Sequence, residues 1–341
     1  MGDPSWQGQD RLLHAVLWTG SDRPSLLRTL VTKALFACRH VLPVSQAACS
    51  ADARKLRAFF AALKHMCTES VDGARVAFLA IVCPPTPQFT YHLAARHTTL
   101  LGLPVFWSGT PPNSCKLLVV YVHGGGFVSG DYSGYQGMCE DLGQALGPDT
   151  CVLFPQYPLA PEVNWLRIVN KVTASITAAA KQDVPLAVFA DSAGGAIALA
   201  SCLALCAGNG PKPSALCLFS PLLDAEGLGA SRVYNTTRDV CFTGDLVRWS
   251  FKQCLRGLQP AQVNPLNQSF RAMCPVFVRC SADEVLLSDA EAVHRNCTRD
   301  GVHCDFLAHP CSFHTAVLFN RYCAEGRREL EDSVQFVRKH V

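Results

Sequence analysis

Ser192 lies in the run Ala190–Gly195 (ADSAGG), between an apolar stretch at 186–190 and a small-residue stretch at 193–205 that favours a helix. A serine at a sharp turn between a strand and a helix exposes its hydroxyl, and small neighbours let that turn close. Because a serine hydroxyl is nearly inert at neutral pH, a base must take its proton as it attacks an acyl carbon. The pattern therefore predicts a nucleophile for acyl transfer rather than an ordinary helix cap.

A glycine-rich run, His123–Phe127 (HGGGF), lies upstream of Ser192. Backbone N–H groups of such a run can point at the negative oxygen that forms during acyl transfer. A phosphate-binding loop would instead continue with Gly-Lys-Ser/Thr, and no G-x-G-x-x-G string follows the first strand of the alternating region, so nucleotide binding is not expected. We predict an oxyanion hole made by the N–H groups of Gly125, Gly126 and Ala193.

The chain resembles the hormone-sensitive-lipase branch of the α/β-hydrolases, which comprises esterases, lipases and arylacetamide-deacetylase-like enzymes. The resemblance runs from about residue 87 to the end, and its motifs occur in the family's order. They are His123–Phe127 (HGGGF), Tyr157–Glu162 (YPLAPE), Asp191–Gly195 (DSAGG), Asp283–Asp289 (DEVLLSD) and His314. The resemblance implies an α/β-hydrolase fold, with a mostly parallel central sheet flanked by helices and a helical cap. It also implies that His123 braces its loop rather than reacting.

The order Ser, acid, His is typical of this fold and indicates the other two catalytic residues. His314 follows a predicted strand late in the chain and is the predicted base. His309 is its nearest rival, but His309 precedes a proline in a loop that matches the one before the family's base. Comparison with the family's Asp-Glu-x-Leu-Leu pattern puts the acid at Asp283, which would orient the imidazole. Glu284 is adjacent and chemically able, and Asp289 lies six residues on.

Composition limits the other classes of function. The chain has 341 residues, of which 49% are hydrophobic and 17% charged, so it is globular and apolar rather than disordered. A net charge of +3 is too small to indicate nucleic-acid binding. The 18 cysteines include no C-x-x-C pair, which argues against a zinc ribbon, and we expect mostly reduced thiols. Neither a metal nor an organic cofactor is expected.

The domain organisation follows from the helical and strand-like patterns. Residues 1–85 read as an N-terminal helical segment that contributes to the cap, with one helix at Ala51–Lys64. A proline cluster at 84–87 marks the passage to the catalytic domain, residues 86–341. The interval at about 225–272 is too long for a simple loop and is predicted to be a cap insertion, with Thr243 capping one of its helices.

Within the catalytic domain, strands and helices alternate, as expected for a parallel sheet with crossover helices. The predicted strands are Leu117–Val122, Thr150–Phe154, Leu186–Ala190, Leu216–Phe219, Val276–Cys280 and Val302–Leu307. The predicted helices cover 133–146, 165–181 and 193–205, with others beginning at about Asp289 and Ala324.

These observations predict a serine carboxylic-ester hydrolase that acts through an acyl-enzyme on apolar esters of short to medium chain length. An amide deacetylase with the same triad is one alternative, and a non-catalytic small-molecule receptor on the hydrolase fold is another. The N-terminus lacks a signal-peptide pattern, and no apolar stretch reaches the roughly 18 residues that span a bilayer, which favours a cytoplasmic location. A peripheral contact with membrane or lipid, and the oligomeric state, are left open.

Overall fold

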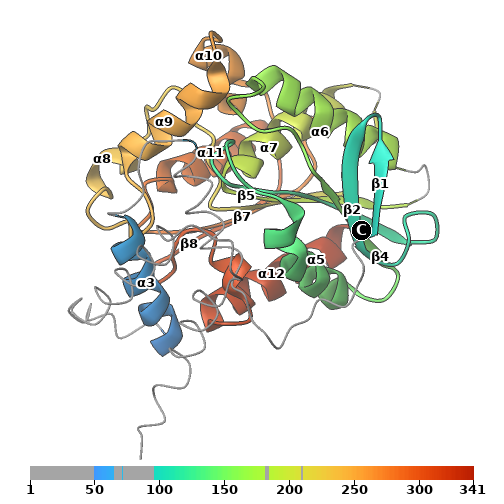
Figure 1. Ribbon diagram of the computed structural model, residues 1–341, viewed down its shortest axis with the longest axis horizontal. Coiled ribbons are helices and arrows are strands. Elements are labelled where there is room, and N and C mark those ends of the chain that lie inside the picture. Colours follow the sequence, from blue (N-terminus) through green and yellow to red (C-terminus); the bar gives the residue numbers. More distant parts are fainter. Residues whose placement is uncertain (1–49, 65–70, 72–95, 181–183, 209) are drawn as a thin grey trace, which may run out of the picture.

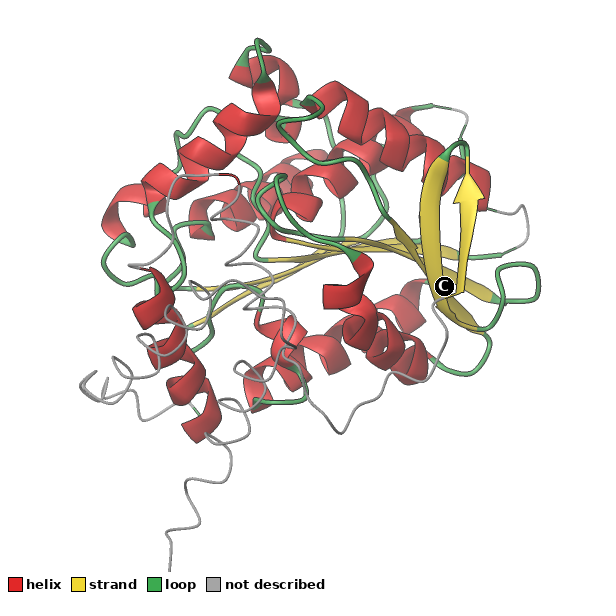
Figure 2. Ribbon diagram, viewed as in Figure 1, coloured by secondary structure: helices red, strands yellow, loops and turns green. Residues whose placement is uncertain are grey.

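The computed structural model describes residues 50–64, 71, 96–180, 184–208 and 210–341. An eight-stranded sheet in the order β1-β2-β4-β3-β5-β6-β7-β8 crosses the molecule, with helices on both faces (Figure 1 and Figure 2). β1 pairs with β2 and β2 pairs with β4 in antiparallel fashion, and strands β3 to β8 all run parallel to one another. The predicted fold class is therefore confirmed. The strands are β1 (Arg96–Leu100), β2 (Leu103–Gly109), β3 (Leu117–Val122), β4 (Thr150–Pro155), β5 (Leu186–Asp191), β6 (Ala215–Phe219), β7 (Val276–Ser281) and β8 (Cys304–His309).

The central strands are buried on both faces, which explains why they read as continuous apolar runs. In β3, Leu118, Val120 and Val122 point into one hydrophobic layer, while Val119 and Tyr121 point into the other. The first layer lies under α6 (Trp165–Ala179), α7 (Ser192–Ala207) and α11 (Leu287–Asp300), and the second lies over α5 (Tyr132–Leu146) and α12 (Ala324–His340). The two layers hold the strands in place, and the candidate functional residues follow the carboxyl ends of these strands.

The segment between β6 and β7 is helical and lies on the same side of the sheet as α7 (Figure 1). It contains α8 (Ser231–Tyr234), α9 (Gly244–Leu255), α10 (Pro260–Val263) and the 3₁₀ turn η2 (Pro265–Asn267). The predicted cap at Thr243 is confirmed, because its side chain accepts from the N–H of Leu246 at the start of α9. The division of the chain into residues 1–85 and 86–341 stays a prediction.

The N-terminal helix α3 (Ala51–Lys64) coincides with the predicted helix. Its apolar face packs on the segment that runs from Phe313, just before His314, through the 3₁₀ turn η3 (Ala316–Phe319). In particular, the ring of Phe60 lies 5.3 Å from those of Phe313 and Phe319. The helices predicted before residue 50 and the proline cluster at 84–87 lie outside the described residues.

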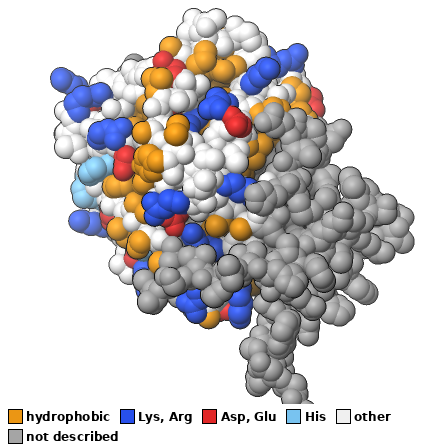
Figure 3. Space-filling view, turned by 90° about the vertical axis from the view of Figure 1, so that its left-hand side faces the viewer, with side chains coloured by type: hydrophobic (Ala, Val, Ile, Leu, Met, Phe, Trp, Pro, Cys, Tyr) orange, Lys and Arg blue, Asp and Glu red, His pale blue; other side chains and the backbone are white. Residues whose placement is uncertain are grey.

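No helix in the described ranges has the length and apolar character needed to cross a bilayer. On the face that carries α3 and α8, Lys and Arg side chains alternate with hydrophobic and acidic ones (Figure 3). In the coloured part of this view, the basic side chains are not gathered into one patch.

Candidate active site

Ser192 is the first residue of α7, directly after β5, and its φ is +49°. A non-glycine residue in this left-handed region is strained, and such strain gathers at functional sites. The turn is closed by a near contact between backbones: a methyl group at Gly194 would lie 2.2 Å from the carbonyl oxygen of Val122. Small residues after Ser192 are therefore a steric requirement of this turn, as the sequence indicated.

The base predicted from the sequence has a carboxylate partner, but not the predicted one. The Nδ1 atom of His314 lies 2.7 Å from Oε2 of Glu284, and both side chains are almost fully buried. Asp283 does not contact the imidazole. The carboxylate at the imidazole is therefore that of Glu284 and not the predicted Asp283, because the loop after β7 turns the two adjacent side chains in different directions.

Asp283 faces two arginines instead. Oδ2 accepts from the Arg57 guanidinium of α3 at 2.9 Å. The Arg238 guanidinium approaches Oδ1 to 2.6 Å as an ion pair, although not with the alignment of a hydrogen bond. Arg57 is buried and also donates to the carbonyl of Ser312, two residues before the predicted base. Asp283 and Arg57 thus tie α3 to the loops that carry the carboxylate and the imidazole.

A short segment after β6 bonds both to Ser192 and to Thr315, the residue that follows His314. The N–H of Leu222 donates to the carbonyl of Ser192 at 2.9 Å. Two residues earlier, the hydroxyl of Ser220 accepts from the N–H of Thr315 at 3.0 Å. Because Nδ1 of His314 is taken by the carboxylate, Nε2 is the ring nitrogen left for a serine proton.

The glycine-rich loop is fastened to the turn that carries Ser192. The N–H of Gly124 lies 3.0 Å from Oδ1 of Asp191 and 3.0 Å from the hydroxyl of Tyr135. That hydroxyl in turn donates to Oδ2 of Asp191 at 2.9 Å. Burial raises the pKa of the Asp191 carboxyl to about 6, and the hydrogen bond from Tyr135 limits that rise. The loop and the turn therefore form one rigid unit.

Backbone N–H groups remain available at this unit. Gly125 and Gly126 have φ of +106° and +61°, and within the described part of the chain no carbonyl accepts from their N–H groups. Ala193 is the second residue of α7, so its N–H is among the four that a helix leaves unpaired. These N–H groups are backbone donors of the kind that stabilises an oxyanion, and their role as an oxyanion hole stays a prediction.

His123 is fully buried, and its imidazole contacts a backbone carbonyl and aromatic side chains. Its Nδ1 lies 2.7 Å from the carbonyl of Gly124, and its ring stacks on Tyr157 with 4.0 Å between centroids. Burial lowers the pKa of the His123 imidazole to about 4, so the ring is neutral at physiological pH. The Tyr157 hydroxyl donates to the carbonyl of His123 at 2.6 Å. These contacts are those of a brace for the loop.

Helix α9 and the turn before it lie against both halves of the site. The rings of Phe251 and Phe127 are 5.2 Å apart, and a methyl group at Gly126 would lie 3.0 Å from the hydroxyl oxygen of Ser250. On the other side, the Phe242 ring meets the His314 ring edge to face at 4.6 Å. The insertion between β6 and β7 therefore borders the glycine loop and the imidazole together.

The remaining sequence candidates have structural contacts. His309 ends β8, and its carbonyl accepts from the N–H of Ala282. Asp289 is buried, pairs with Arg232 at 3.1 Å and accepts from the N–H of Leu223 at 2.7 Å. It therefore holds the beginning of the insertion against α11 and takes no part in the imidazole contact.

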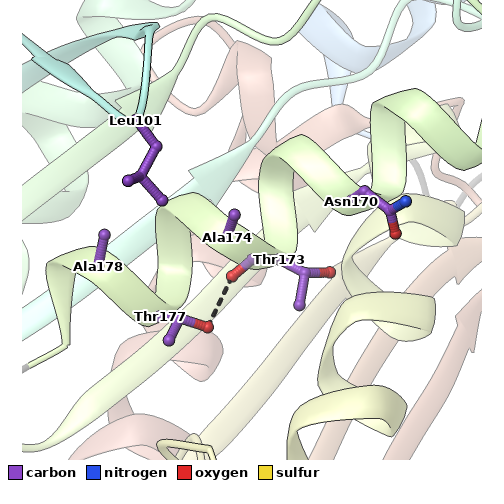
Figure 4. Close-up of a pocket in the computed structure, with 6 residues that line it drawn as sticks. All are labelled: Leu101, Asn170, Thr173, Ala174, Thr177 and Ala178. Atoms are coloured by element: carbon purple, nitrogen blue, oxygen red, sulfur yellow. Dashed lines mark hydrogen bonds between the residues drawn. The ribbon is translucent and has the colours of Figure 1, made fainter.

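A hollow on the outer side of α6 is a different feature of the surface (Figure 4). It is lined by Leu101 of the β1–β2 turn and by Asn170, Thr173, Ala174, Thr177 and Ala178. The Thr177 hydroxyl donates to the carbonyl of Thr173 in the same helix. Because no lining side chain titrates, this hollow cannot supply a nucleophile and a base. Among the described residues, no group of three His, Cys, Asp or Glu side chains is placed to hold a metal ion.

Comparison with known proteins agrees with this geometry. A family model described as the alpha/beta hydrolase fold matches residues 119–318. An acetyl-hydrolase of Streptomyces hygroscopicus is 28% identical over 226 residues, which are 64% of this chain and 75% of that protein. An esterase of Acinetobacter venetianus is 26% identical over 229 residues, 65% of this chain and 75% of that protein. A solved esterase of the bacterial hormone-sensitive lipase family superimposes with a TM-score of 0.78 at 24% identity, covering 86% of this chain and 99% of that chain.

Proposed function

The chain belongs to the α/β-hydrolase fold family and is a carboxylic-ester hydrolase. We propose that it acts through an acyl-enzyme on Ser192, with His314 as the base and Glu284 as the acid. The observation that carries this proposal is the 2.7 Å contact between His314 Nδ1 and Glu284 Oε2. A carboxylate at Nδ1 fixes the tautomer in which Nε2 accepts a proton, and it stabilises the imidazolium that forms.

In the acylation step, Oγ of Ser192 attacks the ester carbonyl carbon and its proton passes to Nε2 of His314. The carbonyl oxygen becomes negative and accepts hydrogen bonds from the N–H groups of Gly125, Gly126 and Ala193. The C–O bond to the alcohol then breaks, and the imidazolium returns its proton to the departing oxygen. Deacylation repeats these steps with water as the nucleophile, which releases the carboxylic acid.

The preferred substrates are esters with short to medium apolar acyl groups. Two contacts support a limit on acyl size: Ser250 lies over Gly126, and Phe251 packs on Phe127. Both contacts place α9 close above the glycine loop, where the acyl carbonyl would bind. The name of one relative agrees, since the Streptomyces hygroscopicus protein is an acetyl-hydrolase.

The test is covalent labelling with a fluorophosphonate, followed by mass spectrometry of the labelled peptide. We expect one adduct, on Ser192, and Ser192→Ala should lose both labelling and at least about 10⁴-fold of p-nitrophenyl acetate turnover. Its circular dichroism spectrum should match that of the wild type. Full turnover by Ser192→Ala, or an adduct on another serine, would remove the proposed mechanism.

Several finer expectations stay predictions from the sequence. These are the cytoplasmic location, the contribution of residues 1–85 to the cap, and a peripheral contact with lipid. To test the contact with lipid, Leu228 and Val233 are the residues to substitute first, because they are 79% and 80% exposed.

A further inference from the structure

Ser220 follows the last residue of β6, and its hydroxyl touches two loops that meet at the active site. Oγ donates to Oε1 of Glu284 at 2.7 Å and accepts from the N–H of Thr315 at 3.0 Å. The residue is 2% exposed, so both contacts are shielded from water. One hydroxyl thus links the carboxylate to the residue that follows His314.

The backbone of Ser220 is strained in a way that a glycine would relieve. Its φ is +46°, in the region that L-residues with a side chain rarely adopt. Ser192 and Thr315, with φ of +49° and +51°, share this conformation. A glycine at position 220 would be relaxed, so the serine side chain is retained at a cost in free energy. The serine hydroxyl makes two hydrogen bonds that a glycine could not make.

The carboxylate of Glu284 has two oxygens with separate partners. Oε1 is held by the Ser220 hydroxyl and by the N–H of Ser281, at 2.6 Å. Oε2 is left for Nδ1 of His314. A glutamate side chain has one more rotatable bond than an aspartate and needs more contacts to hold one orientation. Fixing Oε1 therefore determines where Oε2 lies.

We propose that Ser220 is a positioning residue for ester hydrolysis: its hydroxyl locks Oε1 of Glu284, so that Oε2 stays aligned with the His314 imidazole. This assignment rests on the proposed role of Glu284 as the acid. Without the hydroxyl, the carboxylate turns away for part of the time and stabilises the imidazolium less. Protonation of the base then requires a lower pH, and fewer molecules hold the tautomer that reacts.

The test uses Ser220→Gly and Ser220→Ala, with Ser201→Ala as a control for loss of a buried hydroxyl. Ser201 is fully buried and bonds to Thr173 between α6 and α7. For each protein, the pH profile of kcat/KM for p-nitrophenyl acetate is measured and scaled to the folded fraction from circular dichroism. We expect both Ser220 variants to lose about 10- to 100-fold on the plateau, the loss that removing a group that orients a metal ligand typically causes in metal sites. Their acid limb should move to lower pH, and the control should match the wild type.

Ser220→Gly is the sharper variant, because it removes the hydroxyl and relieves the strained φ together. A plateau within twofold of wild type in both Ser220 variants would overturn the assignment. So would a lowered plateau with an acid limb that stays in place or moves to higher pH, because that result describes a purely structural hydroxyl. Glu284→Gln, measured alongside, distinguishes a failure of the positioning role of Ser220 from a failure of the assignment of Glu284 as the acid. If Glu284→Gln is inactive while the Ser220 variants are active, only the positioning role fails; if Glu284→Gln is fully active, the acid assignment fails as well.

Discussion

Oε2 of Glu284 lies 2.7 Å from Nδ1 of His314, while the carboxylate of the adjacent Asp283 points to Arg57 and Arg238. Two neighbouring acidic residues in one loop thus have different partners. Glu284 is placed to act on the imidazole, and Asp283 is placed to hold α3 and the insertion against the same loop. The separation leads to different expectations for the two residues.

The buried pair Arg57–Asp283 should contribute mainly to stability. Arg57→Met removes the cation at Oδ2 and the donor to the Ser312 carbonyl, so about 3 kcal/mol of unfolding free energy should be lost. Breaking a buried pair leaves the partner's charge poorly compensated, whereas removing both charges does not. The double variant Arg57→Met/Asp283→Leu should therefore recover part of the loss.

Urea unfolding of the two single variants and the double variant gives the coupling energy directly. Purely additive losses would contradict a paired role. In that case, α3 would be held by its phenylalanine contacts alone.

Glu329 should make stability depend on pH. It is fully buried on α12 and accepts from the Ser312 hydroxyl at 3.1 Å. Burial raises the pKa of the Glu329 carboxyl to about 8, well above its ordinary value of 4.5. The folded protein thus holds a proton that the unfolded chain releases. Its contribution to stability is complete below about pH 4.5 and falls by about 1.4 kcal/mol per pH unit as pH rises towards 8.

Glu329→Gln removes this dependence while keeping an acceptor for Ser312. We expect the variant and the wild type to have similar melting temperatures near pH 4.5, and the variant to be the more stable one at pH 8. Melting curves at intermediate pH values should show the difference growing steadily. Parallel curves would mean that Glu329 ionises in the folded protein as easily as in the unfolded chain.

Gly194→Ala should prevent the turn at Ser192 from closing. The added methyl would lie 2.2 Å from the Val122 carbonyl oxygen and 2.4 Å from that of His123, and neither backbone atom can move without displacing β3 or the glycine loop. We expect an insoluble or inactive protein. Gly143→Ala is the matched control, because a methyl at this position in α5 meets only the Val152 side chain at 3.4 Å.

The control should keep its activity and its stability, with a gain of up to about 1 kcal/mol from the reduced freedom of the unfolded chain. The Gly194→Ala and Gly143→Ala proteins are compared by soluble yield, esterase rate and urea midpoint. A soluble and fully active Gly194→Ala protein would show that the close backbone contact at Gly194 is not required for this turn.

Much of the fold was predictable because the central strands are buried on both faces and stand out as apolar runs. The predicted strands and helices from Leu117 onward lie within two residues of the observed ones. The β1–β2 hairpin was missed. Its turn is Leu101-Gly102, with φ of +50° and +75°, and leucine is not a residue that signals such a turn. The edge strand before it, RHTTL, carries no alternation that would mark a core face.

The site was predictable where local sequence determines geometry. Close backbone contacts and positive φ angles require small residues after Ser192 and glycines in the upstream loop. Such residues can be recognised directly in the sequence. The choice between Asp283 and Glu284 was not predictable in this way. It depends on Arg57, more than two hundred residues away, and on the Ser220 hydroxyl, which captures Oε1 of Glu284. Neither contact can be recognised from the sequence around the acidic pair.

The most direct measurement compares kcat/KM of Glu284→Gln and Asp283→Asn with p-nitrophenyl acetate at the pH optimum. Replacing the acid of a triad by its amide favours the wrong imidazole tautomer and has cost about 10⁴-fold in a serine protease. We expect a loss of that order, at least about 10²-fold, for Glu284→Gln with little change in the melting temperature. Asp283→Asn should lose less than about tenfold in kcat/KM and show its main effect as a lower melting temperature. The reverse pattern, with an active Glu284→Gln and an inactive but folded Asp283→Asn, would contradict the assignment of Glu284 as the acid.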